Sequence, residues 1–202
     1  MLNFQTQSGQ LYTPDELISL FHSKPSRFET KIVGIDGCGG SGKSTLAATL
    51  AKEARGTTVV HMDDFYKLSS DIQATNPEFK PVGSDFDWLR LEDQVLNPLF
   101  KNRNTSYQRY DWDTDELKEW HDVPSGGLVI IEGTFTTRNE LFDYYDWTIW
   151  VNCPRDLRLA RGIERDSEEA RHMWEHNWMV AEDRYIRTHQ PHRRADLIID
   201  GY

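Results

Sequence analysis

The sequence predicts an α/β fold in which a parallel sheet is covered by helices on both faces. Two apolar runs, residues 31–36 and 127–132, have the length and composition of buried strands. Such strands alternate along the chain with segments typical of helices, which favours crossover connections between parallel strands. A glycine-rich loop at residues 37–42 joins the first of these strands to a helix. These observations place the chain among the α/β proteins.

Each element is predicted from local patterns. Thr13, Pro14 and Glu16 form a capping box with proline at the first helical position, which predicts a helix at 14–22. The other predicted elements are, in chain order, a strand at 31–36, a helix at 44–54, a strand at 57–62, a helix at 90–100 with a break near Pro98, a short strand pair at 106–112, strands at 127–132 and 146–152, helices over 155–188 with a break near residues 166–167, and a strand at 195–200. Residues 65–84 are polar and proline-rich, as in a functional or mobile loop.

Length and composition limit the classes of protein. The 202 residues fit a single domain, and 23 basic against 33 acidic residues give a net charge of −10. This charge disfavours nucleic acid or an anionic membrane as the main partner, but leaves self-association into a homo-oligomer open. Cys38 and Cys153 are too few for a disulfide framework or a zinc site, and we expect both to be reduced. Because the sequence shows neither a membrane-spanning run nor a signal peptide, we predict a cytoplasmic protein.

The glycine-rich loop satisfies two phosphate-binding patterns. Gly37, Gly39 and Gly42 fit G-x-G-x-x-G, the dinucleotide fingerprint, whereas Gly37, Gly42, Lys43 and Ser44 fit G-x-x-x-x-G-K-[ST], the triphosphate loop. The dinucleotide pattern leaves the lysine and serine unexplained. It also requires an acidic residue about 20 positions further on, and Asp63 lies somewhat beyond that. The triphosphate pattern explains every fixed position and is preferred.

In a triphosphate loop the backbone N–H groups surround the phosphates at the start of a helix. Lys43 would neutralise the β- and γ-phosphate oxygens, and the Ser44 hydroxyl would bind Mg²⁺. The predicted nucleotide-binding residues are Gly37, Cys38, Gly39, Gly40, Ser41, Gly42, Lys43, Ser44 and Thr45.

Phosphoryl transfer also needs a base and a metal-associated acid. Asp63 and Glu132 each follow a predicted strand, and ligands of open α/β sheets bind at the carboxyl ends of strands. Asp63 is therefore placed to accept a proton from an acceptor hydroxyl, and Glu132 to organise Mg²⁺. A helix-capping aspartate and a solvated strand-end glutamate are the alternatives.

Arginines and tryptophans mark the later helices. Arg158, Arg161 and Arg165 are spaced to share one helical face, and either line a lid over the transferred group or pair with neighbouring carboxylates. Trp174 and Trp178, one turn apart, are expected in the core.

Taken together, the motifs resemble the uridine kinase branch of the P-loop kinases, which is related to phosphoribulokinase, pantothenate kinase and nicotinamide riboside kinase. The resemblance runs from about Lys31 to Gly201 and is carried by "GIDGCGGSGKST", "DDFY", "DFD" at 85–87, "RYDW", "VIIEG" and "DLRLARGIERD". The triphosphate loop followed by "DDFY" and a strand-end "EG" is its most specific part. The first 30 residues are not covered.

The resemblance implies a three-layer sandwich with a five-stranded parallel sheet, a small acceptor-binding insertion at about 65–113 and a helical lid at about 155–170. It implies ATP or GTP as phosphoryl donor, with Mg²⁺. By the resemblance the catalytic residues are Asp63, Lys43, Arg161 and Arg165, the acceptor-binding residues are Asp63, Tyr66, Asp87, Tyr110 and Arg158, and the metal-associated residues are Ser44 and Glu132. Asp87 would bind a ribose hydroxyl, and Tyr110 would lie beside the base.

The acceptor positions depart from the family pattern. The family's "FDHPDAFD" reads "FDWLRLED" here, and Asp115 stands near the place of the usual base-reading histidine. We expect Asp111, Asp113 and Asp115 to form an acidic rim that favours a neutral or cationic riboside over a monophosphate.

The sequence therefore predicts ATP-dependent phosphorylation of a small hydroxyl compound, with the 5′-hydroxyl of uridine or cytidine as the leading acceptor. A kinase of another riboside or vitamin-like alcohol is the nearest alternative. A nucleotide-binding switch or ATPase without a small acceptor belongs to a different class, as does a dehydrogenase.

Overall fold

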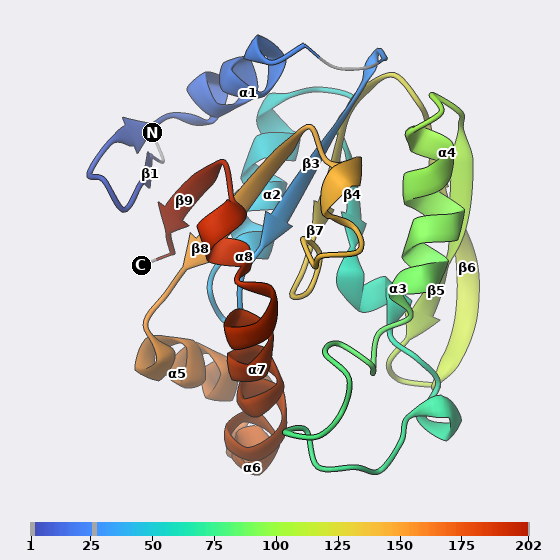
Figure 1. The fold of residues 1–202 in the computed structure, drawn as a ribbon, viewed down its shortest axis with the longest axis vertical. Coiled ribbons are helices and arrows are strands. Elements are labelled where there is room, and N and C mark those ends of the chain that lie inside the picture. Colours follow the sequence, from blue (N-terminus) through green and yellow to red (C-terminus); the bar gives the residue numbers. More distant parts are fainter. Residues whose placement is uncertain (1–2, 26–27, 202) are drawn as a thin grey trace.

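The computed structural model describes residues 3–25 and 28–201, and its centre is a five-stranded parallel sheet (Figure 1). The strand order is β4-β7-β3-β8-β9, so the strand before the glycine-rich loop is central. The bounds of these strands are β3 Thr30–Asp36, β4 Thr58–His61, β7 Gly127–Glu132, β8 Trp147–Asn152 and β9 Leu197–Asp200. All four neighbouring pairs are parallel, which confirms the predicted fold class.

The two faces of the sheet are buried by different helices. Val33 and Ile35 face a core shared with α1 (Pro14–Ser23) and α2 (Lys43–Glu53). Ile32, the residue before Val33, points to the opposite face and belongs to a second core that includes residues of the helical segment 88–99. This alternation follows from the period of two in a strand and produces the three layers.

The N-terminal helix begins as predicted. Thr13 accepts a hydrogen bond from the Glu16 N–H, and the Glu16 carboxylate accepts one from the Thr13 N–H, at 3.3 and 2.7 Å. Before this helix, strands β1 (Phe4–Gln5) and β2 (Leu11–Tyr12) form a small hairpin that the sequence analysis did not predict.

The helix at 90–100 has no break at Pro98. It runs as α3 (Trp88–Leu91), a π-helical turn (Glu92–Leu96) and α4 (Asn97–Leu99). Because Pro98 has no N–H, the carbonyl of Gln94 needs another donor, and the Thr105 hydroxyl fills that role. The wider π turn and this hydroxyl accommodate the proline inside the helix.

The prediction of a strand pair within residues 106–112 is wrong. That segment forms one strand, β5 (Thr105–Asp111), and its antiparallel partner is the following segment, β6 (Glu116–Val123). The partner was missed because most of its residues are polar and exposed, so it has no apolar run.

The C-terminal helices lie beside the loop end of the sheet. After α5 (Arg155–Asp166) the helix breaks at Ser167, whose φ is 75°, as predicted. The following segments are a 3₁₀ turn (Glu168–Ala170), α6 (Arg171–Met173), a π-helical turn (Trp174–Trp178), α7 (Met179–His189) and α8 (Pro191–Arg194). Trp174 is buried as expected, whereas Trp178 is half-buried.

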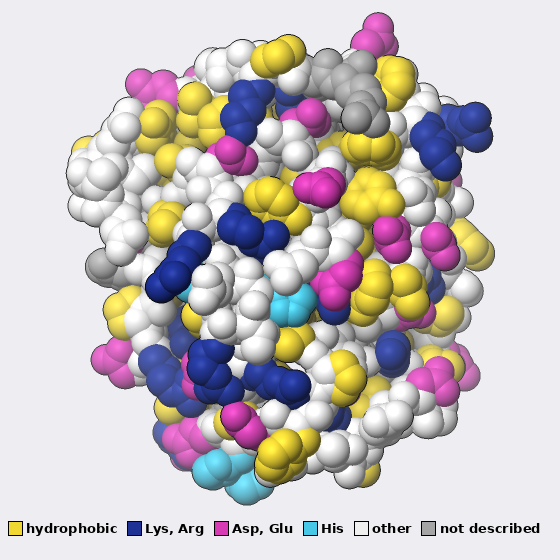
Figure 2. Space-filling model, in the orientation of Figure 1, with side chains coloured by type: hydrophobic (Ala, Val, Ile, Leu, Met, Phe, Trp, Pro, Cys, Tyr) yellow, Lys and Arg dark blue, Asp and Glu magenta, His cyan; other side chains and the backbone are white. Residues whose placement is uncertain are grey.

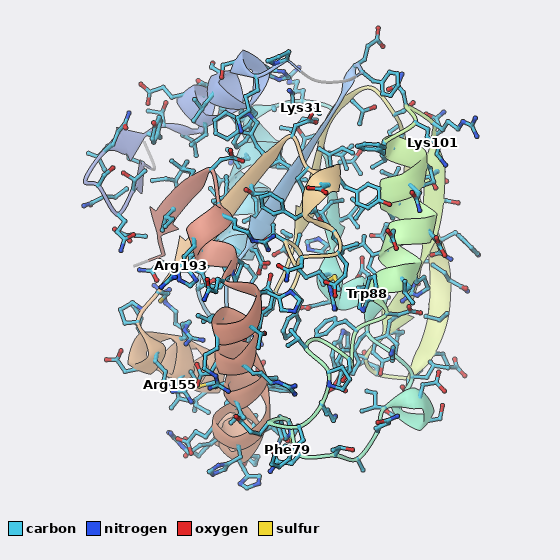
Figure 3. All side chains as sticks on the ribbon, viewed as in Figure 1. Lys31, Phe79, Trp88, Lys101, Arg155 and Arg193 are labelled. Carbon is cyan, nitrogen blue, oxygen red and sulfur yellow. The ribbon has the colours of Figure 1, made fainter. Side chains whose placement is uncertain are left out.

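Further 3₁₀ turns lie at Met62–Phe65, Ser69–Asp71 and Phe142–Tyr144. Figure 2 shows Lys and Arg side chains gathering over the region of α5 to α8, although the whole chain is acidic. The labelled Arg155 and Arg193 lie on these helices, whereas Phe79 lies on the long loop before α3 (Figure 3).

Within residues 3–25 and 28–201, no helix is long and apolar enough to span a membrane. Cys38 and Cys153 are both free, as expected.

Candidate active site

The glycine-rich loop lies between the carboxyl end of β3 and the first turn of α2, and Gly40 and Gly42 are among the positions that require glycine. Gly40 has a φ of 74°, and a Cβ there would lie 2.6 Å from the carbonyl oxygen of Arg158. Gly42, with a φ of 97°, caps the N-terminus of α2. Left-handed glycines in this position direct backbone N–H groups toward one point at a helix start, which is the geometry of an anion-binding loop.

Lys43 is held over this loop. It is the first residue of α2, its side chain is buried, and its Nζ donates a hydrogen bond to the Cys38 carbonyl at 2.9 Å. The ammonium group interacts electrostatically with Asp63 and Glu132. A buried cation is therefore positioned where the loop would hold phosphate oxygens.

Ser44, Glu132 and His61 form a connected group at the ends of α2, β7 and β4. The Ser44 hydroxyl donates to the Glu132 carboxylate at 3.1 Å, and His61 Nδ1 lies 2.5 Å from the same carboxylate. Burial opposes ionisation of Glu132, but the His61 contact, Lys43 and Ser44 together hold its pKa below the usual range. The hydrogen bond to Glu132 is the main reason that the pKa of His61 is raised, and burial opposes it. His61 was not predicted as a site residue, although it precedes "MDDFY" at a strand end.

The oxygen ligands present fit Mg²⁺ bound together with a nucleotide. The described part of the chain has no group of three or more His, Cys, Asp or Glu residues that could hold a metal alone. Mg²⁺ in kinases is bound by one or two protein oxygens, with phosphates and water supplying the rest. The adjacent hydroxyl of Ser44 and carboxylate of Glu132 are such a pair.

Asp63 lies across the site, in the 3₁₀ turn that follows β4. Its side chain is exposed because it faces an open cavity, but protein surrounds it on the other sides. This desolvation raises the pKa of the carboxyl group, and repulsion by Glu132 acts in the same direction, whereas Lys43 and Arg165 oppose the shift. Asp63 is thus a better proton acceptor than an ordinary aspartate.

Two buried carboxylates that the sequence analysis missed accept hydrogen bonds from backbone N–H groups of the glycine-rich loop. Glu182 on α7 accepts a hydrogen bond from the Gly39 N–H at 2.6 Å. Asp36 at the end of β3 accepts from the Gly37 N–H at 2.7 Å and from the Tyr185 hydroxyl at 2.6 Å. Burial raises the pKa of both carboxyls against the hydrogen bonds that favour their ions. Only the tertiary fold brings α7 against the loop, so no local pattern identified Glu182.

The three arginines of α5 that were predicted as site residues, Arg158, Arg161 and Arg165, have different surroundings. Arg158 is buried and donates to Glu182 at 2.7 Å, and it does not line the cavity, so the structure does not support its predicted contact with the acceptor. Arg161 lines the cavity and donates to the carbonyls of Gly40 and Gly201 at 3.2 and 2.5 Å. Arg165 is exposed, pairs with Asp166 and also lines the cavity.

A single cavity of about 1060 Å³ joins these groups. It is lined by Lys43, Ser44, Asp63, Glu132, Arg161 and Arg165. The side chains of Tyr66, Phe86 and Trp112 line the part nearest the long loop, and the Tyr66 and Trp112 rings lie 4.4 Å apart. The planar faces of these aromatic rings therefore line the same cavity as Asp63, the predicted general base.

Asp87 and Tyr110 are not among the cavity-lining residues. Asp87 caps α3 by accepting from the Arg90 N–H at 3.1 Å. The Tyr110 hydroxyl donates to Asp115 at 2.8 Å, and Asp111 accepts from the N–H groups of the β5–β6 turn. Because none of Asp111, Asp113 and Asp115 lines the cavity, the expected acidic rim is not part of it.

Comparison with known proteins gives the family. The model of the phosphoribulokinase / uridine kinase family matches residues 32–200. A uridine-cytidine kinase-like 1 protein of Mus musculus is 30% identical, over 85% of this chain and 33% of its own length. A uridine kinase of Staphylococcus epidermidis is 29% identical over 70% of each chain, and a nicotinamide riboside kinase of Saccharomyces cerevisiae is 27% identical over 66% of this chain and 65% of its own.

Solved structures share the fold. One described as a possible uridine kinase from Bacillus stearothermophilus has a TM-score of 0.73 at 24% identity, covering 93% of this chain and 97% of its own. A D-glycerate 3-kinase from Cryptococcus neoformans has a TM-score of 0.65 at 15% identity, covering 93% of each chain. With a family match over most of its length and the corresponding fold, the chain belongs to the phosphoribulokinase / uridine kinase family.

Proposed function

We propose that the protein is an ATP-dependent small-molecule kinase that phosphorylates the 5′-hydroxyl of uridine or cytidine with Mg²⁺. The observation that carries the proposal is the placement of Asp63 in one cavity with Lys43, Ser44 and Glu132. A phosphate-binding loop alone would suit a switch or an ATPase. A base with a raised pKa facing that loop instead suits transfer to a hydroxyl.

In the proposed reaction Asp63 accepts the proton of the acceptor hydroxyl as its oxygen attacks the γ-phosphoryl group. Lys43 and the loop N–H groups stabilise the charge that passes to the leaving phosphate oxygen. Arg161 and Arg165 line the same space and add positive charge there. Ser44 and Glu132 would hold Mg²⁺, which neutralises phosphate charge when bound.

The acceptor would lie in the part of the cavity lined by Tyr66, Phe86 and Trp112, within the proposed insertion at 65–113. Aromatic faces suit a planar base. The proposed lid at 155–170 consists mainly of α5 and would close over the cavity that Arg161 and Arg165 line. The yeast relative keeps a cationic nicotinamide riboside as a second candidate acceptor. The predicted cytoplasmic location and self-association stay predictions.

The test is ADP release measured with ATP and a panel of nucleosides, nicotinamide riboside, pantothenate and nucleoside monophosphates. We expect stimulation by uridine or cytidine above the rate without acceptor. Asp63→Asn should lower kcat by about 10² with a smaller change in acceptor KM. Asp122→Asn, an exposed change on β6, is the matched control. Hydrolysis that no acceptor stimulates would contradict the proposal.

A further inference from the structure

The N-terminal hairpin lies against the β9 edge of the sheet, outside the segment that the family model matches. Thr6 bridges Ile199 in antiparallel fashion, and the Gln7 N–H donates to the Ile198 carbonyl at 3.3 Å. Phe4 packs on the core between the sheet and α2. In Figure 1 the hairpin lies beside β9. This contact fixes residues 3–12 next to the carboxyl end of the last strand.

The order of the strands separates two regions of the cavity. Asp63 follows β4 at one edge of the sheet, and the aromatic acceptor region belongs to the same side. Asp200 and Gly201 end β9 at the other edge, with the glycine-rich loop between the two edges after the central β3. A donor whose γ-phosphate faces Asp63 must therefore extend its base toward β9.

The cavity wall on the β9 side includes residues of the hairpin. Asn3 and Phe4 line it together with Thr45, Ile199, Asp200 and Arg161. These residues combine an apolar ring, an amide, a carboxylate and a guanidinium group. An apolar ring with a few polar groups beside it is the usual lining of a small-molecule site.

We infer that Asn3 and Phe4 form one wall of the donor's base site. The inference rests on the proposed function, because it requires a nucleoside triphosphate in the loop. Phe4 supplies apolar contact with the base, the Asn3 amide supplies hydrogen bonding at its edge, and Arg161 links the wall to the loop through Gly40 and Gly201. The hairpin thereby contributes to donor specificity while the family core supplies the phosphate site.

The test compares binding of Mg·ATP with binding of Mg·tripolyphosphate, which has the phosphates without a base. By titration calorimetry, Phe4→Ala should weaken ATP by about 10-fold and leave tripolyphosphate within about twofold, because only the base contact is lost. Asn3→Ala, at an exposed position, should weaken ATP to a smaller degree. Leu11→Ala, an exposed change in the same hairpin outside the cavity, is the control and should alter neither affinity.

The melting temperature is measured for each variant, since Phe4 also packs on the core. Should Phe4→Ala fail to fold, Phe4→Leu keeps apolar bulk without the ring and should still weaken ATP selectively. Unchanged ATP affinity in folded Phe4 and Asn3 variants overturns the inference and leaves the proposed function intact. An equal loss of affinity for ATP and for tripolyphosphate has the same meaning. A wild-type protein that binds neither ligand overturns both.

Discussion

The buried Lys43 and the cavity-facing Asp63 divide the work of the site between a fixed cation and an accessible base. The Cys38 carbonyl orients the ammonium group at 2.9 Å, so its charge is in place before a nucleotide binds. Charge that is already positioned does not have to reorganise during transfer. Asp63 has to meet an incoming hydroxyl and therefore faces the cavity.

Replacing Lys43 by alanine should abolish phosphoryl transfer, because the charge is lost where negative charge passes between oxygens. The fold should persist, which far-ultraviolet circular dichroism and the melting temperature would show. Lys52→Ala, an exposed change on the same helix, should leave turnover unchanged. A folded Lys43→Ala variant with near-normal turnover would refute the role of the loop as a triphosphate site.

The pH dependence of the reaction should report Asp63. Desolvation raises its pKa, so the carboxylate needed as a base is protonated at a higher pH than a free aspartate, whose pKa is about 3.9. The rate should therefore be full above the raised pKa and fall as the pH drops through it. Profiles of log kcat/KM against pH should show this acidic limb for wild type, and Asp63→Asn should lose it. If the acidic limb of the profile were unchanged in Asp63→Asn, the titration would belong to a group other than Asp63.

At the scale of elements, one buried ion pair connects α5, α7 and the loop. Arg158 and Glu182 lie 2.7 Å apart with both side chains about 6% exposed, and Glu182 also accepts from the Gly39 N–H. Breaking one partner of such a pair leaves an uncompensated buried charge. The pair therefore sets the position of the loop against α7 and against α5, the helix of the proposed lid region.

Glu182→Gln should lower the free energy of unfolding by about 3–5 kcal/mol, because Arg158 loses its counterion. Chemical denaturation measures this change. Glu175→Gln breaks the exposed pair with Arg171 and should cost only about 0–1 kcal/mol. Equal effects of the two substitutions would show that the buried pair has no special structural role.

The elements that sequence reasoning predicted well are those with strong local signals. The five strands have apolar runs, and α1 has a capping box that the structure reproduces. The polar strand β6 and the hairpin at Phe4–Tyr12 have no such signal, because their pairing partners rather than their own side chains stabilise them. The helix containing Pro98 was mispredicted because a distant hydroxyl, that of Thr105, replaces the missing backbone donor.

At the scale of the whole molecule, the site combines residues that a motif predicts with residues that only the fold brings together. Lys43, Ser44, Asp63 and Glu132 were predicted from a loop and two strand ends, and they line one cavity. Glu182 comes from a helix 143 positions after Gly39, its hydrogen-bond partner. The roles that the family resemblance implies agree least with the structure in the acceptor region. There Asp87 caps α3 and is not among the cavity-lining residues.

The two regions of the cavity should act independently, since they belong to opposite edges of the sheet. Trp112, 51% exposed and in contact with Tyr66, lines the acceptor region, so Trp112→Ala should raise the acceptor KM about 10-fold and leave the ATP KM unchanged. Trp120→Ala, at a 59% exposed position outside the cavity, is its control. Phe4→Ala should do the reverse and raise only the ATP KM.

In the double variant Trp112→Ala with Phe4→Ala, the two effects on kcat/KM should multiply, because distant sites without shared partners couple by less than about 0.5 kcal/mol. Two-substrate steady-state kinetics on the four proteins of this cycle measure the coupling. A coupling well above that value, or a Trp112→Ala variant whose ATP KM rises as much as its acceptor KM, would mean that one ligand occupies both regions. The β4 edge and the β9 edge would then not divide acceptor from donor.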